Sequence, residues 1–296
     1  MKTRVISATC YVAILVAFYL LKIFVSDFCF DVLIYAFSLI GTFEILRATK
    51  EKTTKSQRNL VRIFALGCIP ACAVCEYFYS YGLHVSCAGF FGLAILLLSL
   101  FVVDSQKTTP ENTGVALFCA IYPTLLLSLF VLGNHIEAVP ALANVAFHSD
   151  LFVLFVFVVS PCADAVAFLF GCTLRKRFPK KMAPNISPNK TVVGGIGGVI
   201  GGMAGAVVLY FVYNGLLFGS FENMGLWLPL YIFIGAFSSI ATEFGDLIES
   251  SIKRKLDIKD MGNIMPGHGG VLDRIDGTMF SSVVTYLVFA VVHLIA

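Results

Sequence analysis

The chain has 296 residues, of which 58% are hydrophobic and 13% are charged, and its formal net charge at pH 7 is +3. A soluble domain with a mean hydropathy of +0.88 would expose a mostly apolar surface, so this composition excludes an ordinary soluble protein. We therefore predict an all-α polytopic integral membrane protein, and we expect no nucleic-acid partner.

Nine apolar segments are long enough to cross a bilayer core of about 30 Å as helices. They lie near residues 5–25, 28–46, 60–80, 84–103, 113–133, 147–172, 191–216, 226–250 and 278–295. The first follows a basic start, as in a signal peptide, but it lacks a small-residue cleavage motif, and we interpret it as a transmembrane helix. We divide the chain into N-terminal transmembrane helices, about five in 1–145, and a C-terminal catalytic region, about four helices with cytoplasmic motif loops in 146–296.

The basic residues of the loops gather on one side of the predicted membrane. Lys and Arg occur in the N-terminal tail, in 47–62, at Lys107, in 175–190 and in 253–274. Lys22 is the exception. By the positive-inside rule, the N-terminus is cytoplasmic and the C-terminus is outside. Glu44, near the end of the second apolar segment, is expected to pair with Arg47.

Two polar features follow in the sixth and seventh segments. Asp164 lies inside an apolar run, where a carboxylate is costly unless it faces protein or water, so we consider it an intramembrane site acid. A hydrogen bond between helices is the alternative. Ser187, Lys190 and Thr191 then precede a glycine-rich helix start, a combination that favours phosphate. The order of residues is not that of a P-loop, and most of the glycines also have a simple packing explanation.

The stretch from Glu243 to Gly277 is the most polar part of the C-terminal half. Four of its residues recur at steps of three and four, which places them on one face of a helix: Glu243, Asp246, Ser250 and Lys253. Asp273 and Asp276 begin the last apolar segment, where carboxylates suit the positive end of a helix.

A glycine-rich turn, PGHGG, separates the two carboxylate pairs, and its glycines let backbone N–H groups approach an anion. Four bases lie nearby: Lys253, Arg254, Lys259 and Arg274. Magnesium takes oxygen ligands, usually one or two carboxylates, and completes its shell with phosphate oxygens and water. The stretch therefore predicts a magnesium and phosphate site; the alternative is a solvated loop with helix caps.

The run SSIKRKLDIKDMGNIMPGHGGVLDRID resembles the signature of the phosphatidate cytidylyltransferase (CDP-diacylglycerol synthase) family, S-x-hydrophobic-K-R, four residues, K-D, then P-x-H-G-G-x-x-D-R-x-D. Met265 stands where the family usually has Leu, Ile or Phe, and Gly277 replaces a common Ser.

An upstream motif of the same family has an Asp, an aromatic residue, a basic stretch, S-P-x-K-T and E-G-x-x-G-G. The matching residues are Asp164, Phe168, Gly171, Ser187, Pro188, Lys190, Thr191, Gly194, Gly197 and Gly198. Val193 occupies the usual Glu position and Cys172 a common Arg position, so a role of that Glu cannot be transferred. Together the motifs cover about 160–280, and the N-terminal half agrees with the family only in hydropathy.

The resemblance implies a membrane enzyme of phospholipid biosynthesis that transfers CMP from CTP to phosphatidic acid, giving CDP-diacylglycerol and pyrophosphate. It implies Mg²⁺, with a second cation left open, and a homodimer among membrane lipids. We expect a multi-pass protein of the cytoplasmic (inner) membrane, and the positive-inside rule places the motif carboxylates, and with them the active site, on the cytoplasmic face. The lack of a long N-terminal extension suggests a bacterial protein. The alternatives are a related CTP-dependent lipid kinase and a non-enzymatic transporter; clustered polar residues at one membrane face argue against the transporter.

The residues that carry these roles follow from the motif positions. The metal-binding aspartates correspond to Asp246 and Asp273, and the wider catalytic set is Asp246, Lys259, Asp260, Asp273 and Asp276. The expected phosphate and substrate contacts are Ser187, Lys190, Thr191, Lys253, Arg254, His268, Gly269, Gly270 and Arg274.

Overall fold

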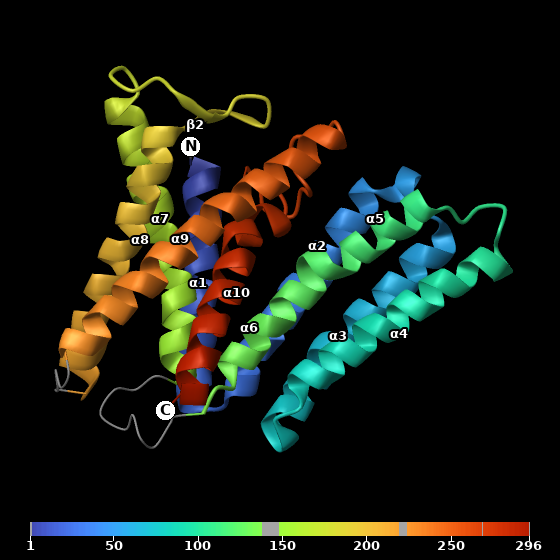
Figure 1. The fold of residues 1–296 in the computed structure, drawn as a ribbon, viewed down its shortest axis with the longest axis horizontal. Helices are drawn as coiled ribbons and strands as arrows, with labels where there is room; N and C mark the ends of the chain where they lie inside the picture. The colour runs from blue at the N-terminus through green and yellow to red at the C-terminus, as the bar shows by residue number, and fades with distance from the viewer. Residues whose placement is uncertain (1, 138–147, 219–223, 268, 296) are drawn as a thin grey trace. The chain divides into compact units, whose positions relative to one another are not determined.

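The computed structural model describes residues 2–137, 148–218, 224–267 and 269–295 (Figure 1). Within these residues, nine helical spans are long and apolar enough to cross a membrane, which confirms the predicted all-α polytopic architecture. The helices are α1 (Lys2–Phe24), α2 (Asp27–Ala48), α3 (Lys55–Tyr79), α4 (Gly82–Val103), α5 (Pro110–Ala120), α6 (Leu126–Asn134), α7 (Ser149–Leu174), α8 (Val192–Val212), α9 (Met224–Lys255) and α10 (Leu272–Ile295). Short helical turns, η1 (Lys50–Lys52), η2 (Ile121–Leu125) and η4 (Tyr213–Phe218), complete them.

The chain forms two compact units. The first comprises Met1–His135 and Leu256–Ile275, and the second comprises Ile136–Lys255 and Asp276–Ala296. The glycine-rich turn of the signature thus packs with the N-terminal helices, whereas the acids of α9 belong to the second unit.

In the first unit, capping residues set where the helices begin. Thr54 and Gln57 form a reciprocal capping box at the start of α3, and Thr109 and Asn112 form another at α5. A π-helical turn, η2, joins α5 to α6 around Pro123, whose ring removes an amide donor. The two capping boxes explain why α3 and α5 begin before their apolar runs. The π-helical turn explains how the span from α5 to α6 continues through a proline.

Buried hydroxyl groups link α2 to the proline turn. Ser38 donates to the Thr124 hydroxyl at 3.1 Å, and Thr42 lies 3.0 Å from the same oxygen. Such pairs satisfy polar groups that lipid would leave without partners.

Lys22, the base that departs from the charge asymmetry, has its own explanation in the first unit. It is buried, its ammonium donates to the Asp27 carboxylate, and it also reaches the Asn134 carbonyl oxygen at 3.4 Å. Lys22 lies within α1, whereas the positive-inside rule counts the bases of the loops, so its position does not oppose the predicted orientation.

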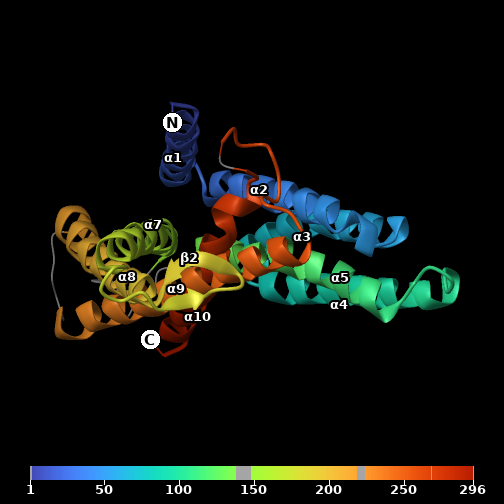
Figure 2. The same ribbon diagram turned by 90° about the horizontal axis from the view of Figure 1, so that it is seen from above.

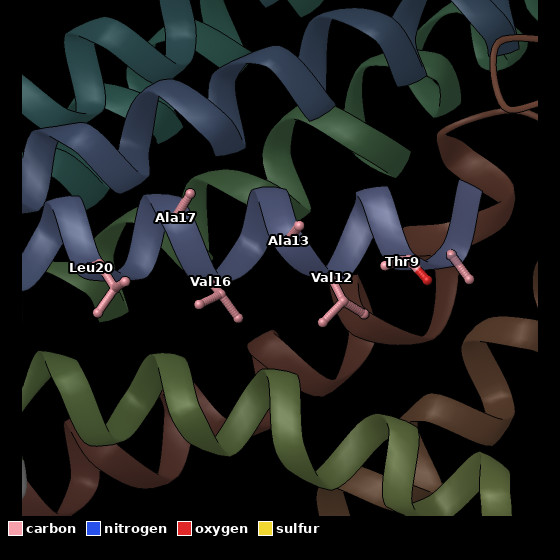
Figure 3. Close-up of a pocket in the computed structure, with 7 residues that line it drawn as sticks. Thr9, Val12, Ala13, Val16, Ala17 and Leu20 are labelled. Atoms are coloured by element: carbon pink, nitrogen blue, oxygen red, sulfur yellow. The ribbon is translucent and has the colours of Figure 1, made fainter. Parts of the chain in front are cut away.

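One face of α1 is apolar and shallowly hollowed. Figure 3 labels side chains along it, among them Val12, Val16 and Leu20, and the rest of the hollow is lined by α1 residues as well. These three side chains are 46–55% exposed. An exposed apolar helix face is what a lipid-facing helix presents.

In the second unit, α7, α8 and α9 pack closely because their contact faces carry glycine (Figure 2). A Cβ built on Gly201 would lie 2.6 Å from the Cys162 carbonyl oxygen of α7. One built on Gly202 would lie 2.5 Å from the Ser239 Cβ of α9. Real Cβ atoms do not tolerate such distances, so the packing explanation of the glycine repeat is confirmed at these positions.

The predicted cytoplasmic loop before α8 contains a small hairpin. Strands β1 (Lys181–Ala183) and β2 (Ser187–Thr191) pair antiparallel, with Ala183 opposite Ser187 and Lys181 opposite Thr191. The Thr191 hydroxyl then accepts a hydrogen bond from the Gly194 amide and caps α8. The hairpin therefore delivers Lys190 and Thr191 to the helix start in a defined position.

Candidate active site

The second unit brings together three charged residues of the two sequence motifs. The Lys190 ammonium at the end of β2 lies 2.8 Å from Asp246 Oδ2 and 3.2 Å from Glu243 Oε2 on α9. Glu243 and Asp246 are three positions apart, so they share the helix face that their spacing predicts. The residues are separated by more than 50 positions in the chain, and the hairpin is what joins them.

The electrostatic balance at Lys190 favours the charged form. Burial by itself lowers the pKa of the Lys190 ammonium, but the neighbouring Asp246 and Glu243 carboxylates together raise this pKa by more than burial lowers it, so the net effect is a pKa above the ordinary value. Lys190 is therefore a fixed positive charge between two acids. A charge held this way can meet an anionic ligand without a change of protonation.

These residues line a cavity of about 600 Å³. Asp164 on α7 lines the same cavity, so the intramembrane acid and the motif residues share one space. Arg175, directly after α7, also lines it and was not among the predicted site residues. The signal available was its position three residues after Cys172, the usual Arg position, which would place both on the same side of a continuing helix.

Three other predicted phosphate contacts lie in the hairpin and in α9. Ser187 lies at the start of β2 and is not one of the residues that line the cavity. Lys253 is paired with Glu249 at 2.8 Å, one helical turn earlier. Arg254 donates from Nε to the Ile186 carbonyl oxygen at 3.4 Å, which ties α9 to the hairpin.

Asp276, on α10, joins the acids of α9. Its carboxyl interacts electrostatically with Asp246 and Glu249. The backbone is equally close here, because a Cβ built on Gly245 would lie 2.7 Å from the Asp276 carbonyl oxygen. The second unit therefore gathers four acids, two of them facing Lys190, around the α9 helix.

Asp273, the other predicted metal ligand, lies in the first unit and orders the signature turn. Its Oδ2 accepts hydrogen bonds from the backbone amides of Gly270 at 2.7 Å and Met261 at 2.9 Å. The turn itself is closed by Met265 N–H to the Gly269 carbonyl, and Gly269 has a φ of +88°, which glycine adopts without strain. These hydrogen bonds are those of a capping residue, and they also orient the carboxylate in the way that outer partners orient metal ligands.

The remaining residues of the turn differ in exposure. Lys259, Asp260 and Arg274 are exposed, so each can reach a ligand in solvent. His268 lies outside the described residues. Gly269 and Gly270 belong to the turn that Asp273 orders, and Gly270 contributes its amide to that carboxylate.

Sequence reasoning missed Glu44 as a neighbour of this turn. Its Oε1 accepts from the Val271 amide at 3.0 Å, and its Oε2 accepts from the Leu272 amide at 2.8 Å. In the described part of the chain there is no ion pair between Glu44 and Arg47, so the expected pairing is wrong. A buried carboxylate needs hydrogen-bond donors for both of its oxygens, and two backbone amides meet that need better than one flexible side chain would.

The donor set of the second unit fits magnesium by its chemistry. Asp246 and Glu243 supply carboxylate oxygens and already share one cation, the Lys190 ammonium. Among the described residues, no three acid, histidine or cysteine side chains approach closely enough to hold a metal ion alone. Magnesium usually needs only one or two carboxylates when phosphates complete its shell, so this arrangement suits a metal that arrives with a nucleotide.

Comparison with known proteins gives a consistent result along the chain. A family model described as the cytidylyltransferase family matches residues 2–292. A Bacillus subtilis (strain 168) protein named phosphatidate cytidylyltransferase is 30% identical over 276 residues, covering 92% of this chain and 93% of that protein. Proteins of the same name from Staphylococcus haemolyticus (strain JCSC1435) and Staphylococcus saprophyticus are 40% and 43% identical over 129 residues, covering 44% of this chain and 45% of each relative.

The match with the family model extends well beyond 160–280. The prediction that the N-terminal half agrees only in hydropathy is therefore wrong. Agreement in apolar segments is spread over many similar residues, and it does not form short motifs that can be recognised by eye.

Proposed function

Because the chain belongs to the cytidylyltransferase family, we propose that it transfers CMP from CTP to phosphatidic acid, giving CDP-diacylglycerol and pyrophosphate. The protein is a multi-pass membrane nucleotidyltransferase of phospholipid biosynthesis, and a relative that matches 92% of the chain carries the corresponding name. The observation that carries the residue assignment is the Lys190 ammonium held between Glu243 and Asp246 in the wall of a cavity.

The reaction fits this arrangement of charges. A phosphate oxygen of phosphatidic acid forms a bond to the α-phosphorus of CTP, and the bond from that phosphorus to the oxygen bridging to the β-phosphate breaks. Pyrophosphate leaves with that oxygen and its electron pair. Positioning and charge neutralisation contribute more to such a step than an acid or a base does.

The cations of the cavity then have distinct tasks. Lys190 and Arg175 face the space that the nucleotide phosphates would occupy, and Thr191 offers a hydroxyl beside the start of α8. Glu243 and Asp246 hold the ammonium in place, so its charge is oriented before the substrate binds. Lys259, Arg274 and the turn at Gly269 are the proposed contacts contributed by the signature loop.

Asp246 and Asp273 are the proposed metal ligands, with Asp260 and Asp276 as orienting acids. When bound there, Mg²⁺ would neutralise charge on the transferring phosphate and its leaving group. We further propose a homodimer in the cytoplasmic membrane with the motif loops on the cytoplasmic side, where CTP is available. The segregation of loop bases supports that orientation.

The experiment is lipid synthesis by the purified protein. Phosphatidic acid in detergent is incubated with magnesium and CTP labelled at the α- or the γ-phosphate, and the lipids are separated by thin-layer chromatography. The proposal expects α-label in CDP-diacylglycerol and γ-label only in pyrophosphate. Transfer of γ-label to lipid would indicate a kinase, and no labelled lipid at all would leave the transporter. Asp246→Asn protein is the control for contaminating activity.

A further inference from the structure

We propose that Glu44, from α2, is a positioning residue for Asp273, and that it sets the magnesium and CTP affinity of the signature turn. This inference rests on the proposed function, because it assumes that Asp273 contacts the magnesium nucleotide. All the contacts that carry it lie within the first unit. The juxtaposition joins an acid in the N-terminal half of the chain to a loop 227 residues later.

The Glu44 carboxylate accepts two backbone hydrogen bonds at the start of α10, and we call this pair of contacts the clamp. Each carboxylate oxygen of Glu44 has its own donor, Val271 N–H at 3.0 Å and Leu272 N–H at 2.8 Å. Leu272 precedes Asp273 in the chain. Helix starts leave their first amides without partners inside the helix, and Glu44 supplies acceptors for two of them.

Asp273 continues the same network on the other side of the turn. Its Oδ2 binds the amides of Gly270 and Met261, so the turn from Met261 to Leu272 is held at both ends by buried carboxylates. Glu44 is 5% exposed and Asp273 is 9% exposed. Since the two acids bind adjacent amides of one short segment, movement of the Glu44 contacts must alter where Asp273 lies.

The turn is also shaped to receive the Glu44 carboxylate. A Cβ built on Gly270 would lie 2.5 Å from both Glu44 oxygens, and one built on Gly262 would collide with the same group. Side chains are therefore excluded on two sides of the carboxylate. The space left by these two glycines is filled by the Glu44 carboxylate, whose two oxygens accept from the Val271 and Leu272 amides.

The test begins with Glu44→Gln, which keeps the size but replaces one acceptor by an NH₂ donor. That donor would face a backbone N–H group, so one amide loses its partner. Loss of a group that hydrogen-bonds a metal ligand directly weakens metal binding by about 10- to 100-fold. Glu44 acts on Asp273 through the backbone of Val271 and Leu272, so we expect the magnesium concentration for half-maximal CDP-lipid synthesis to rise by about 10-fold, the lower end of that range. The rate at saturating magnesium should change much less.

A second readout does not depend on turnover. Hydrogen exchange of the peptide covering 261–275, measured by mass spectrometry, should become faster in Glu44→Gln because one amide loses its acceptor. Equilibrium dialysis should show weaker binding of CTP in the presence of magnesium. Glu44→Asp retains two acceptor oxygens on a shorter side chain and should fall between wild type and Glu44→Gln in both measurements.

The matched control is Glu76→Gln. Glu76 also uses a carboxylate oxygen to accept a backbone hydrogen bond, from Gly82 at 2.8 Å, but at the turn between α3 and α4. It should leave the magnesium requirement and the exchange of 261–275 unchanged. Gly262→Ala perturbs the contact from the loop side while α2 stays intact, and it should raise the magnesium requirement as Glu44→Gln does. Gly67→Ala, with open space around its Cβ, is the control for that change.

Several outcomes would overturn the inference. One is a folded Glu44→Gln protein with faster loop exchange but a wild-type magnesium titration, which would make the clamp purely structural. If Glu44→Gln does not fold, Gly262→Ala decides: faster exchange with an unchanged magnesium requirement overturns it. Asp273→Asn distinguishes a failure of the proposed role of Asp273 from a failure of the inference about Glu44. If that variant titrates magnesium like wild type, the proposed role of Asp273 fails; if only the Glu44 variants do, the inference alone fails.

Discussion

Removal of the Lys190 ammonium should destabilise the second unit by an amount that its two contacts predict. Hydrogen bonds to charged groups contribute about 1.5–3 kcal/mol each. Lys190 and Asp246 side chains are 25% and 27% exposed, so solvent screening places both contacts at the lower end of that range. Lys190→Met should therefore lower the free energy of unfolding by about 3 kcal/mol. Glu243→Gln, which removes the negative charge from one of the two contacts, should cost about 1.5 kcal/mol.

The two changes should not add. Without the ammonium, Glu243 and Asp246 repel each other on one face of α9, and neutralising Glu243 then relieves the repulsion. In the Lys190→Met background, Glu243→Gln should cost nothing or stabilise the protein. The resulting coupling energy is about 1.5 kcal/mol or more, well above the roughly 0.3–0.5 kcal/mol within which independent sites add.

The assay is reversible unfolding in mixed detergent micelles, followed by fluorescence of Trp227. It is the only tryptophan of the chain and lies buried in α9, within the same unit. The control cycle pairs Glu243→Gln with Lys253→Met, because Lys253 lies about 15 Å further along the helix and pairs with Glu249. A Lys190–Glu243 coupling energy no larger than that of the control cycle would refute the proposed charge cluster.

Three further predictions concern the site and its orientation. Asp246→Asn and Asp273→Asn should each nearly abolish turnover and raise the magnesium requirement, with the double variant little worse; strictly multiplicative losses at an unchanged requirement would make these acids separate structural caps. Asp164→Asn should retain more activity than Asp273→Asn in the lipid assay, and wild-type activity of both would remove the site assignment. A Cys introduced by Ser187→Cys should react with an impermeant thiol reagent only after cells are permeabilised, relative to the unsubstituted chain; labelling in intact cells would contradict the predicted topology.

Hydropathy predicted the number and order of the spans because lipid imposes a length and a composition on every helix that crosses it. It could not predict the polar starts of the helices. The third segment was expected at 60–80, whereas α3 begins at Lys55, since Thr54 and Gln57 cap it in a region without apolar residues. The hairpin was also missed, because strands of three and five residues rich in lysine and asparagine have little intrinsic strand preference.

The site was predictable where chemistry is concentrated in side chains and not where it involves the backbone. The spacing of Glu243 and Asp246 indicated a shared face, and Lys190 was recognised through its own motif, but nothing in the sequence joined the two. The partners of Glu44 are amide groups of Val271 and Leu272, which every residue except proline possesses. A contact of this kind has no residue-type signature, so only the three-dimensional arrangement reveals it.

Val193 stands where the family motif usually has Glu. The position usually occupied by Glu in the family lies at the start of α8, close in the chain to Lys190. A lysine there without an acid would be a partly buried, unpaired cation, which is costly. In this chain Asp246 and Glu243 of α9 provide the counter-charges: the Glu243 Oε2 lies 3.2 Å from the Lys190 ammonium, and its Oε1 would lie 2.7 Å from a Cβ built on Gly198 of α8. The valine is therefore compatible with a paired Lys190, because a carboxylate of α9 reaches the start of α8, and Gly198 leaves the space that this carboxylate needs.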